Sequence, residues 1–333
     1  MQRIFYLLFV LVFVSCNRNT ETEKFQSDRS NVVDVSKKLK ELYTDEVLIG
    51  AYPKLHLGCG YLIVKDYKSY EKLMHFFSLE NFEYVLSVGD IGQGPKEITN
   101  IGHLEVDEER RKLYVSDHGK NKVLSYDIDS LIASPTSYDF QTKVRIKEGL
   151  FPSSYCYIND TLSYARVIKP TSASTFEQGV GKWNMVTGEM EMMPYSHPDV
   201  EMKRSLFDVS LKNNIYAEVY LRHDLISICD LNGNLKCNIY GPDWNGGGRS
   251  RISCFGGVEV TDKYIIASYS GGNYDKEYNP KRILIFDMEG DYIKTLDFER
   301  EIIDFCYDHV HNRIILSFND DMQFGYLDLN GLI

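Results

Sequence analysis

The sequence has 333 residues, 43% hydrophobic and 26% charged, so it can bury a sizeable core and is not disordered overall. Its 24 tyrosines and 17 phenylalanines, against two tryptophans, favour strands, where aromatic side chains pack well on a pleated surface. The net charge of −11, with no cluster of lysine and arginine, lacks the electrostatic signature of a nucleic-acid-binding protein, so we expect no nucleic-acid partner.

The first sixteen residues have the features of a targeting segment. Arg3 gives a positive start, and an unbroken apolar run follows from Ile4 to Val14, shorter than the roughly 20 residues that a membrane span needs. The run ends in Ser15-Cys16, which resembles a bacterial lipobox, where the cysteine is diacylated and becomes the new N-terminus. We predict a lipoprotein signal peptide over residues 1–16 with lipid attachment at Cys16; an ordinary cleaved signal peptide is the alternative.

Residues 17–44 are polar and rich in Asn, Thr, Glu, Lys and Ser. This composition predicts a flexible tether between the lipid and the domain. A helical apolar period over roughly Ser36 to Tyr43 makes that part a candidate short helix. The folded domain is then expected over residues 45–333.

Six cysteines follow Cys16, widely scattered and mostly inside apolar runs, which favours buried free thiols over disulfides. Cys229 and Cys237 flank one hairpin turn and are the pair to test for a disulfide. No Cys-x-x-Cys pair exists, so a zinc ribbon or thioredoxin-type site is unsupported.

Short apolar or aromatic runs recur along the chain, and many end in Asp or Asn before a turn, as in Ser125-Tyr126-Asp127 and Ile285-Phe286-Asp287. They recur about every fifty residues, the sequence sign of a propeller. We predict an all-β, six-bladed β-propeller with four-stranded antiparallel blades; a β-sandwich is the structural alternative.

The last repeat has only three predicted strands, near Ile302–Tyr307, Arg313–Phe318 and Phe324–Leu329. We expect its missing outer strand to come from the N-terminal run Glu46–Ile49. That pairing would close the ring and remove an open sheet edge.

A glycine-rich loop joins two of the predicted blades, Gly89 to Glu97, with Gly92, Gly94 and Pro95 in it. No helix follows to offer a phosphate its N-terminus, so these residues are interpreted as a structural turn. Gly92-Gln93-Gly94-Pro95-Lys96-Glu97 resembles the Gly-x-Gly-Pro-x-Glu signature of TolB-like six-bladed propeller lipoproteins of Gram-negative bacteria. The repeated aromatic–Asp turns resemble those of the wider NHL and TolB propeller group. The resemblance covers residues 45–333, although only the first two blades carry sharp motifs. It implies a propeller fold and a location in the cell envelope, in the outer membrane, with the side of the membrane left open; it implies no activity.

The long irregular segments fall on one predicted face, around the mouth of the central channel. They are Gly89–Asn100, Lys169–Gly179, Tyr195–Ser205, Gly241–Arg251 and Ser270–Lys281. Because loops on a rigid scaffold carry function, we expect a ligand-binding rim there. The candidate rim residues are Gln93, Asp117, His118, Trp244, Arg249 and Tyr274. Trp244 could stack on a sugar or clamp a peptide side chain, or it could fold back onto the blade below.

No Gly-x-Ser-x-Gly, His-Glu-x-x-His or Walker motif is present, so no catalytic residue is predicted. Six-bladed lactonases and gluconolactonase-type hydrolases hold a calcium ion in the channel. Asp117, Asn159 and Asp262 are residues of the right type for such a site. Calcium is therefore the one cofactor considered.

We expect a lipid-anchored envelope propeller that binds an envelope protein, a peptide or a glycan through its long-loop face, without covalent chemistry. One alternative is a calcium-dependent hydrolase of lactones or esters, and the other is a structural component of an envelope complex.

Overall fold

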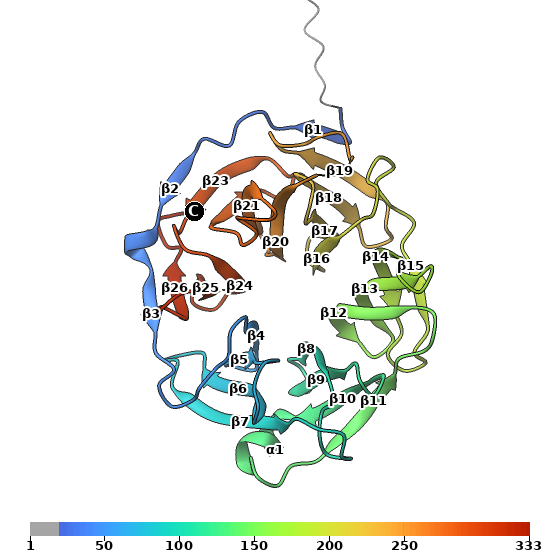
Figure 1. The fold of residues 1–333 in the computed structure, drawn as a ribbon, viewed down its shortest axis with the longest axis vertical. Coiled ribbons are helices and arrows are strands. Elements are labelled where there is room, and N and C mark those ends of the chain that lie inside the picture. The colour runs from blue at the N-terminus through green and yellow to red at the C-terminus, as the bar shows by residue number, and fades with distance from the viewer. Residues whose placement is uncertain (1–19, 249) are drawn as a thin grey trace, which may run out of the picture.

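The structure is a computed structural model that describes residues 20–248 and 250–333. The predicted signal peptide, Cys16 and Arg249 lie outside the described residues. Six sheets stand around a central axis like the blades of a propeller (Figure 1). The predicted all-β, six-bladed architecture with four-stranded antiparallel blades is confirmed.

The first three blades are formed by consecutive antiparallel strands, the innermost strand first. Blade 1 contains β4 (Lys54–Gly58), β5 (Tyr61–Lys65), β6 (Lys72–Ser78) and β7 (Tyr84–Asp90). Blade 2 contains β8 (Ile101–Asp107), β9 (Lys112–Asp117), β10 (Lys122–Asp127), α1 (Ile128–Ala133) and β11 (Phe140–Arg145). Blade 3 contains β12 (Phe151–Asn159), β13 (Leu162–Pro170), β14 (Phe176–Trp183) and β15 (Met190–Met192).

No helix in the described part of the chain is long and apolar enough to cross a membrane.

The other three blades follow the same order, but the last one lacks a fourth strand of its own. Blade 4 contains β16 (Ser205–Ser210), β17 (Ile215–Tyr220), β18 (Leu225–Asp230) and β19 (Leu235–Tyr240). Blade 5 contains β20 (Ile252–Val260), β21 (Ile265–Asn273), β22 (Arg282–Phe286) and β23 (Tyr292–Asp297). Blade 6 contains β24 (Ile302–Asp308), β25 (Arg313–Phe318) and β26 (Phe324–Asp328).

The hydrophobic core is divided among the gaps between neighbouring blades. Leu86 of blade 1 and Leu113 of blade 2 share one cluster, and Leu55 of blade 1 shares another with Ile315 of blade 6. A middle strand such as β25 therefore faces a core on both sides, and all six of its residues are buried. Such strands read as continuous apolar runs instead of alternating ones.

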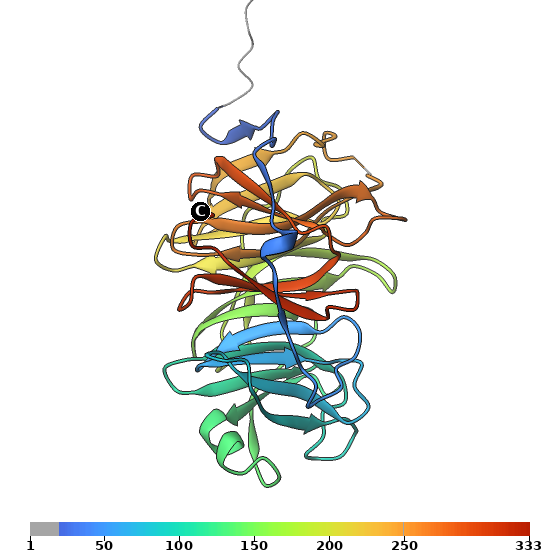
Figure 2. The same cartoon turned by 90° about the vertical axis from the view of Figure 1, so that its left-hand side faces the viewer.

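Residues 20–44 form a strap along the outer edges of three blades, visible in blue in Figures 1 and 2. β1 (Glu23–Phe25) pairs in parallel with β19, and β2 (Val32–Asp34) pairs in parallel with β23. A 3-10 turn, η1 (Ser36–Lys38), follows, and β3 (Lys40–Leu42) then pairs antiparallel with β26. The flexible tether predicted for this segment is therefore wrong for residues 20–44. The possible short helix over Ser36 to Tyr43 is reduced to the 3-10 helix η1, because β3 follows it. Strands of three residues are too short to show a hydrophobic period, so they could not be recognised from the sequence.

The ring is closed by an N-terminal strand, as predicted, but by a different one. β3 supplies the fourth strand of blade 6, whereas the expected run Glu46–Ile49 lies in the connection from β3 to β4. In that connection Ile49 is buried between blades 6 and 1, and Leu48 is 93% exposed. The apolar run Glu46–Ile49 therefore reflects the burial of Ile49 and not the pairing of a strand.

Arg29 anchors the strap at the junction of blades 4 and 5. One guanidinium nitrogen donates to Asp224 Oδ1 at 2.7 Å, and the two side chains are only 7% and 0% exposed. Tyr269 of blade 5 donates to the same carboxylate, and the guanidinium carbon lies 5.4 Å from the ring centroid of Phe286. One buried ion pair thus joins the strap to two blades.

The six described cysteines are all free. Cys229 packs in the core between blades 3 and 4, while Cys237 packs in the core between blades 4 and 5. Their side chains lie on opposite faces of one sheet, so Cys229 and Cys237 do not form the disulfide considered from the sequence. Burial raises the pKa of every thiol, to about 12 for Cys59 and Cys229.

We expect native thiols to react with iodoacetamide at about pH 8 on the order of a thousandfold more slowly than free cysteine, because so little thiolate is present. Unfolding in guanidinium chloride should release all six. Mass spectrometry of the labelled protein measures both rates. A disulfide-linked peptide joining Cys229 to Cys237 would contradict the structure.

Replacing Arg29 with Met should lower the free energy of unfolding by about 3–5 kcal/mol, since it leaves a buried carboxylate without its cation. Lys24 is the matched control, because its ion pair with Asp291 lies at the surface, with side chains 25% and 68% exposed. Lys24→Met should cost less than about 1 kcal/mol. Denaturant unfolding of both variants tests this, and equal effects would show that Arg29 does not anchor the strap.

Candidate functional site

The two faces of the ring carry different kinds of loops. The long-loop face holds the connections between blades and the loops from second to third strands. The hairpin face holds the tight turns, α1 and the C-terminus, which is marked at the left of the edge-on view in Figure 2. Connecting segments on the long-loop face include residues 91–100, 193–204, 241–248 and 274–281. The predicted segment Lys169–Gly179 is shorter than expected, because β13 and β14 extend into it.

Exposed apolar side chains gather on the long-loop face. Eight of the twelve large exposed ones among the described residues lie there: Tyr43, Leu48, Tyr52, Tyr67, Tyr70, Ile91, Met202 and Tyr278. The hairpin face has three, Val186, Leu211 and Val310. Concentration on one face, and not scatter over the whole surface, is the pattern expected of a surface that contacts other molecules.

Two aromatic residues predicted for the rim are engaged with neighbouring side chains. Trp244 packs on Tyr240, with ring centroids 4.8 Å apart, and on His197 and His223, so its indole folds back onto blade 4. Tyr274 lies under the guanidinium of Arg222 at 3.9 Å. Gln93 is exposed on the β7–β8 connection, as a rim residue should be.

Asp117 is a structural carboxylate and not a rim ligand. It is fully buried and accepts backbone N–H groups of Thr99, Asn100, Gly119 and Lys120 at 3.1–3.2 Å. These bonds fix the turn after β9 to the glycine-rich loop before β8.

The glycine-rich loop is a structural turn, as interpreted from the sequence. The Glu97 side chain accepts the Gly94 N–H at 2.7 Å, and Lys120 Nζ donates to the Gly94 carbonyl at 2.7 Å. A Cβ on Gly92 would lie 2.0 Å from Glu97 Oε2, so a larger residue there would displace the carboxylate that accepts the Gly94 N–H. Gly89 has φ +85°, which favours glycine, and Pro95 is exposed at the tip.

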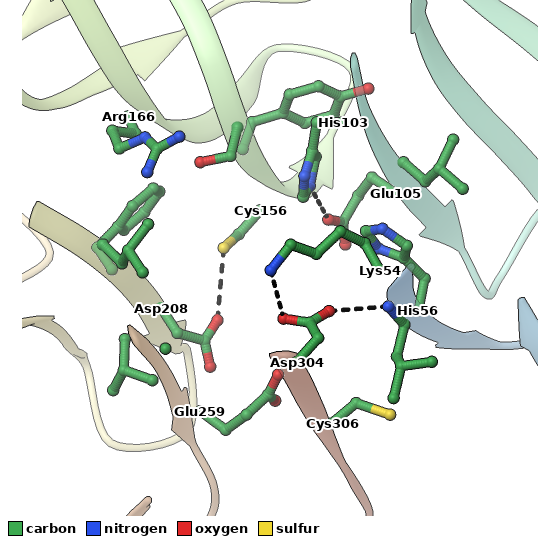
Figure 3. A pocket seen from close by; sticks show the side chains of 18 of the residues that line it. Lys54, His56, His103, Glu105, Cys156, Arg166, Asp208, Glu259, Asp304 and Cys306 are labelled. Carbon is green, nitrogen blue, oxygen red and sulfur yellow. Dashed lines mark hydrogen bonds and ion pairs between the residues drawn. The ribbon is translucent and has the colours of Figure 1, made fainter. Parts of the chain in front are cut away.

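A cavity of about 720 Å³ occupies the centre of the ring. All six inner strands contribute to its lining, which runs from residues near their first positions to residues near their last (Figure 3). Besides three tyrosines, the ionisable side chains among the lining residues are Lys54, His56, Lys65, His103, Glu105, His118, Cys156, Arg166, Asp208, Glu259, Asp304 and Cys306. Of these, sequence reasoning had singled out His118 alone as a candidate site residue.

Carboxylates dominate the half of the channel toward the hairpin face. Asp208 accepts the Val260 N–H at 2.6 Å and the Cys156 thiol at 3.4 Å. Burial, and then repulsion from Asp208, hold the pKa values of Glu105 and Glu259 well above the usual range. Burial also raises the pKa of Asp208. These groups therefore retain protons more readily than surface carboxylates do.

Cations and histidines dominate the half toward the long-loop face. Lys54 Nζ lies 3.1 Å from Asp304 Oδ1, and the other oxygen of that carboxylate accepts the Leu55 N–H at 2.8 Å. Burial lowers the pKa of Lys65 to about 8 and that of His103 to about 3. Burial is also the main reason that the pKa of His56 lies well below its ordinary value, and its Nε2 has no hydrogen-bond partner in the described part of the chain.

The three calcium candidates do not converge. Asp117 is at the long-loop end of β9, whereas Asn159 and Asp262 are exposed in tight turns of the hairpin face. Asn159 accepts the Thr161 N–H at 3.0 Å, and Asp262 pairs with Lys212 at 2.6 Å. Within residues 20–248 and 250–333, no group of three His, Cys, Asp or Glu side chains is placed to hold a metal ion. These three candidates therefore do not share one calcium site.

Comparison with known proteins agrees with the six-bladed propeller seen in the structure. A family described as DUF5128, a 6-bladed beta-propeller, matches residues 23–167. No curated protein matches the chain. The resemblance to six-bladed propellers is thus confirmed, through a family other than the TolB-like and NHL groups suggested by the glycine-rich motif.

Solved structures of similar shape come from Bacteroides. A member of the DUF4221 family from Bacteroides vulgatus has a TM-score of 0.61 at 12% identity, covering 86% of this chain and 94% of its own. A Bacteroides fragilis protein whose name describes it as exported has a TM-score of 0.53 at 12% identity, covering 92% and 98%. The extracellular domain of a one-component system from B. thetaiotaomicron has a TM-score of 0.51 at 11% identity, covering 83% of this chain and 33% of that one. At such identities the likeness shows the fold alone.

Asp117→Ala should lower the free energy of unfolding by about 3 kcal/mol, because it strands buried backbone N–H groups. Asp262→Ala should change it by less than about 1 kcal/mol, since that ion pair is exposed. Denaturant unfolding measures both. Stabilisation of the wild type by about millimolar calcium that both substitutions abolish would restore the channel-metal hypothesis.

Proposed function

We propose that this protein is a non-catalytic binding module of the cell envelope that takes a small polar ligand into its central channel from the long-loop face. The observation that carries the proposal is a channel of about 720 Å³ lined by ionisable side chains from every blade. This volume lies within the range of small-molecule sites, about 300–1,000 Å³.

The electrostatics of the channel support a binding role. Buried charges and polar groups destabilise a fold unless each is paired, so a purely structural channel would be lined by apolar or mutually paired side chains. Here Glu105 and Glu259 repel Asp208, and His56 Nε2 lacks a partner within the described residues. A ligand with complementary groups would remove these costs, which is the usual reason that such groups cluster at functional sites.

The long-loop face supports entry from that side. Tyr52, Tyr67 and Tyr70 project from blade 1 on this face, and Tyr278 projects from blade 5. Amphipathic tyrosines suit contact with glycans and peptide side chains. A peptide end or a short glycan is therefore the class of ligand we propose.

The envelope location rests on two supports. One is the predicted lipid attachment at Cys16, with the outer membrane of a Gram-negative bacterium as the proposed site. The other is the likeness to two structures, one described as an exported protein and one as an extracellular domain. A hydrolase is not proposed, because the pKa of the Cys156 thiol is raised by burial and the calcium candidates lie apart.

The proposal is tested by thermal unfolding against amino acids, dipeptides, neutral sugars and uronic acids. A compound present at ten times its Kd should add about 1.4 kcal/mol to the free energy of unfolding. Cys156→Phe places a ring in the channel and should abolish that stabilisation.

Val186→Phe is the matched control, because the same ring is added at an exposed position on the hairpin face. It should leave the stabilisation unchanged. If no compound stabilises the wild type, or if Cys156→Phe keeps the effect, the channel does not bind such ligands.

A further inference from the structure

Two cations in the long-loop half of the channel have no carboxylate in an ion pair with them among the described residues. Lys65 of β5 donates to the Gly102 carbonyl at 2.6 Å. Arg166 of β13 donates to Ser153 Oγ at 2.8 Å and, with another nitrogen, to the Ser205 carbonyl at 3.4 Å. All three acceptors are neutral oxygens. The two side chains come from blades 1 and 3 and line the same cavity.

The neighbouring Lys54 shows that a lysine in this part of the channel can form an ion pair with a carboxylate. It pairs with Asp304, and that carboxylate also offsets part of the positive potential felt by Lys65. Lys65 is nevertheless repelled by Lys54 and by Arg166, and burial disfavours its charge further. The chain has 48 acidic residues against 37 lysines and arginines, so a shortage of carboxylates does not explain two partly buried cations that form no ion pair.

Two uncharged imidazoles lie in the same half of the channel. His103 and His118 both have lowered pKa values, first because they are buried and then because Lys65 is near. The Nε2 atom of His118 is buried and has no hydrogen-bond partner among the described residues. A buried polar atom without a partner calls for an explanation, and a group bound in the cavity beside it supplies one.

We propose that Lys65 and Arg166, together with His118, form a subsite that binds an oxyanion, either a carboxylate or a phosphate group of the ligand; His103 is not included, because its Nε2 lies 3.1 Å from Glu105 Oε2. A guanidinium offers parallel N–H donors that match the two oxygens of such a group. An ammonium adds a point charge, and the neutral imidazole of His118 can donate a further hydrogen bond through its unpartnered Nε2. The inference rests on the proposed function, since it concerns the same channel.

The opposite half of the channel sets the orientation of the ligand. Glu105, Asp208 and Glu259 lie near the hairpin-face ends of β8, β16 and β20. Their oxygens would accept hydrogen bonds from hydroxyl or ammonium groups and, when ionised, would repel a second anion. The ligand therefore carries its oxyanion toward the long-loop face and hydrogen-bond donors toward the hairpin face.

The test is calorimetric titration of the purified protein with four probes at constant ionic strength. Acetate and glucuronate represent carboxylates, and inorganic phosphate and glycerol phosphate represent phosphates. We expect binding of one class at one site per chain. Lys65→Met and Arg166→Met should each weaken it by ~10-fold to 100-fold.

Lys212→Met is the matched control, because this lysine is 68% exposed on the hairpin face. It should leave the affinity unchanged. Without any anion, Lys65→Met should unfold at the same temperature as the wild type or higher, since it removes an unpaired buried charge. A lower unfolding temperature would indicate a structural role and would overturn the proposal for this residue. Arg166→Lys keeps the charge and should bind better than Arg166→Met.

Two outcomes would overturn the subsite. One is no binding of any of the four probes. The other is binding that persists at wild-type strength in both Lys65→Met and Arg166→Met. If the oxyanions fail while a neutral or cationic compound stabilises the wild type but not Cys156→Phe, the proposed function holds and the oxyanion subsite does not.

Discussion

The ring depends on the pairing of β3 with β26. A propeller without this contact would end in a three-stranded blade with an exposed edge, and such an edge invites pairing with another chain. Because β3 precedes the first blade in the chain, its pairing with the last blade joins the two ends of the repeat. Every gap between neighbouring blades then holds an apolar core. Unfolding of any one blade would expose the two cores on its sides.

The rest of the strap extends this principle to two blades that already have four strands. β1 and β2 add parallel strands to the edges of blades 4 and 5, and the buried Arg29–Asp224 pair holds the strap between them. Main-chain hydrogen bonds at free sheet edges do not require apolar side chains. This is how a polar segment with the composition of a tether becomes part of the fold.

The inner edges of the blades meet the opposite requirement. They have no further strand to pair with, and charged side chains that point into the channel keep them from collapsing onto one another. Paired charges such as Lys54 and Asp304 meet that need at little cost. Lys65 and Arg166 go beyond it, because they are partly buried and form no ion pair with a carboxylate among the described residues. Unpaired buried charge in a cavity is a cost that binding relieves, which links the architecture of the ring to its proposed role.

Local patterns in the sequence determined the all-β class, the number of blades, most of the strands and the free cysteines, because each of these follows from short apolar runs and their spacing. The glycine-rich turn could also be assigned from sequence, since three glycines and a proline lie close together between two predicted strands. Only the tertiary structure decided the rest. It folded Trp244 onto Tyr240, separated Asp117 from Asp262 on opposite faces, and brought Lys65, His103 and Arg166 from three blades to one cavity. A charged residue inside a predicted inner strand is a signal that could have pointed to the channel, as at Glu105, Asp208 and Glu259. Convergence of such residues depends on the register and order of blades far apart in the chain, and no local pattern encodes that.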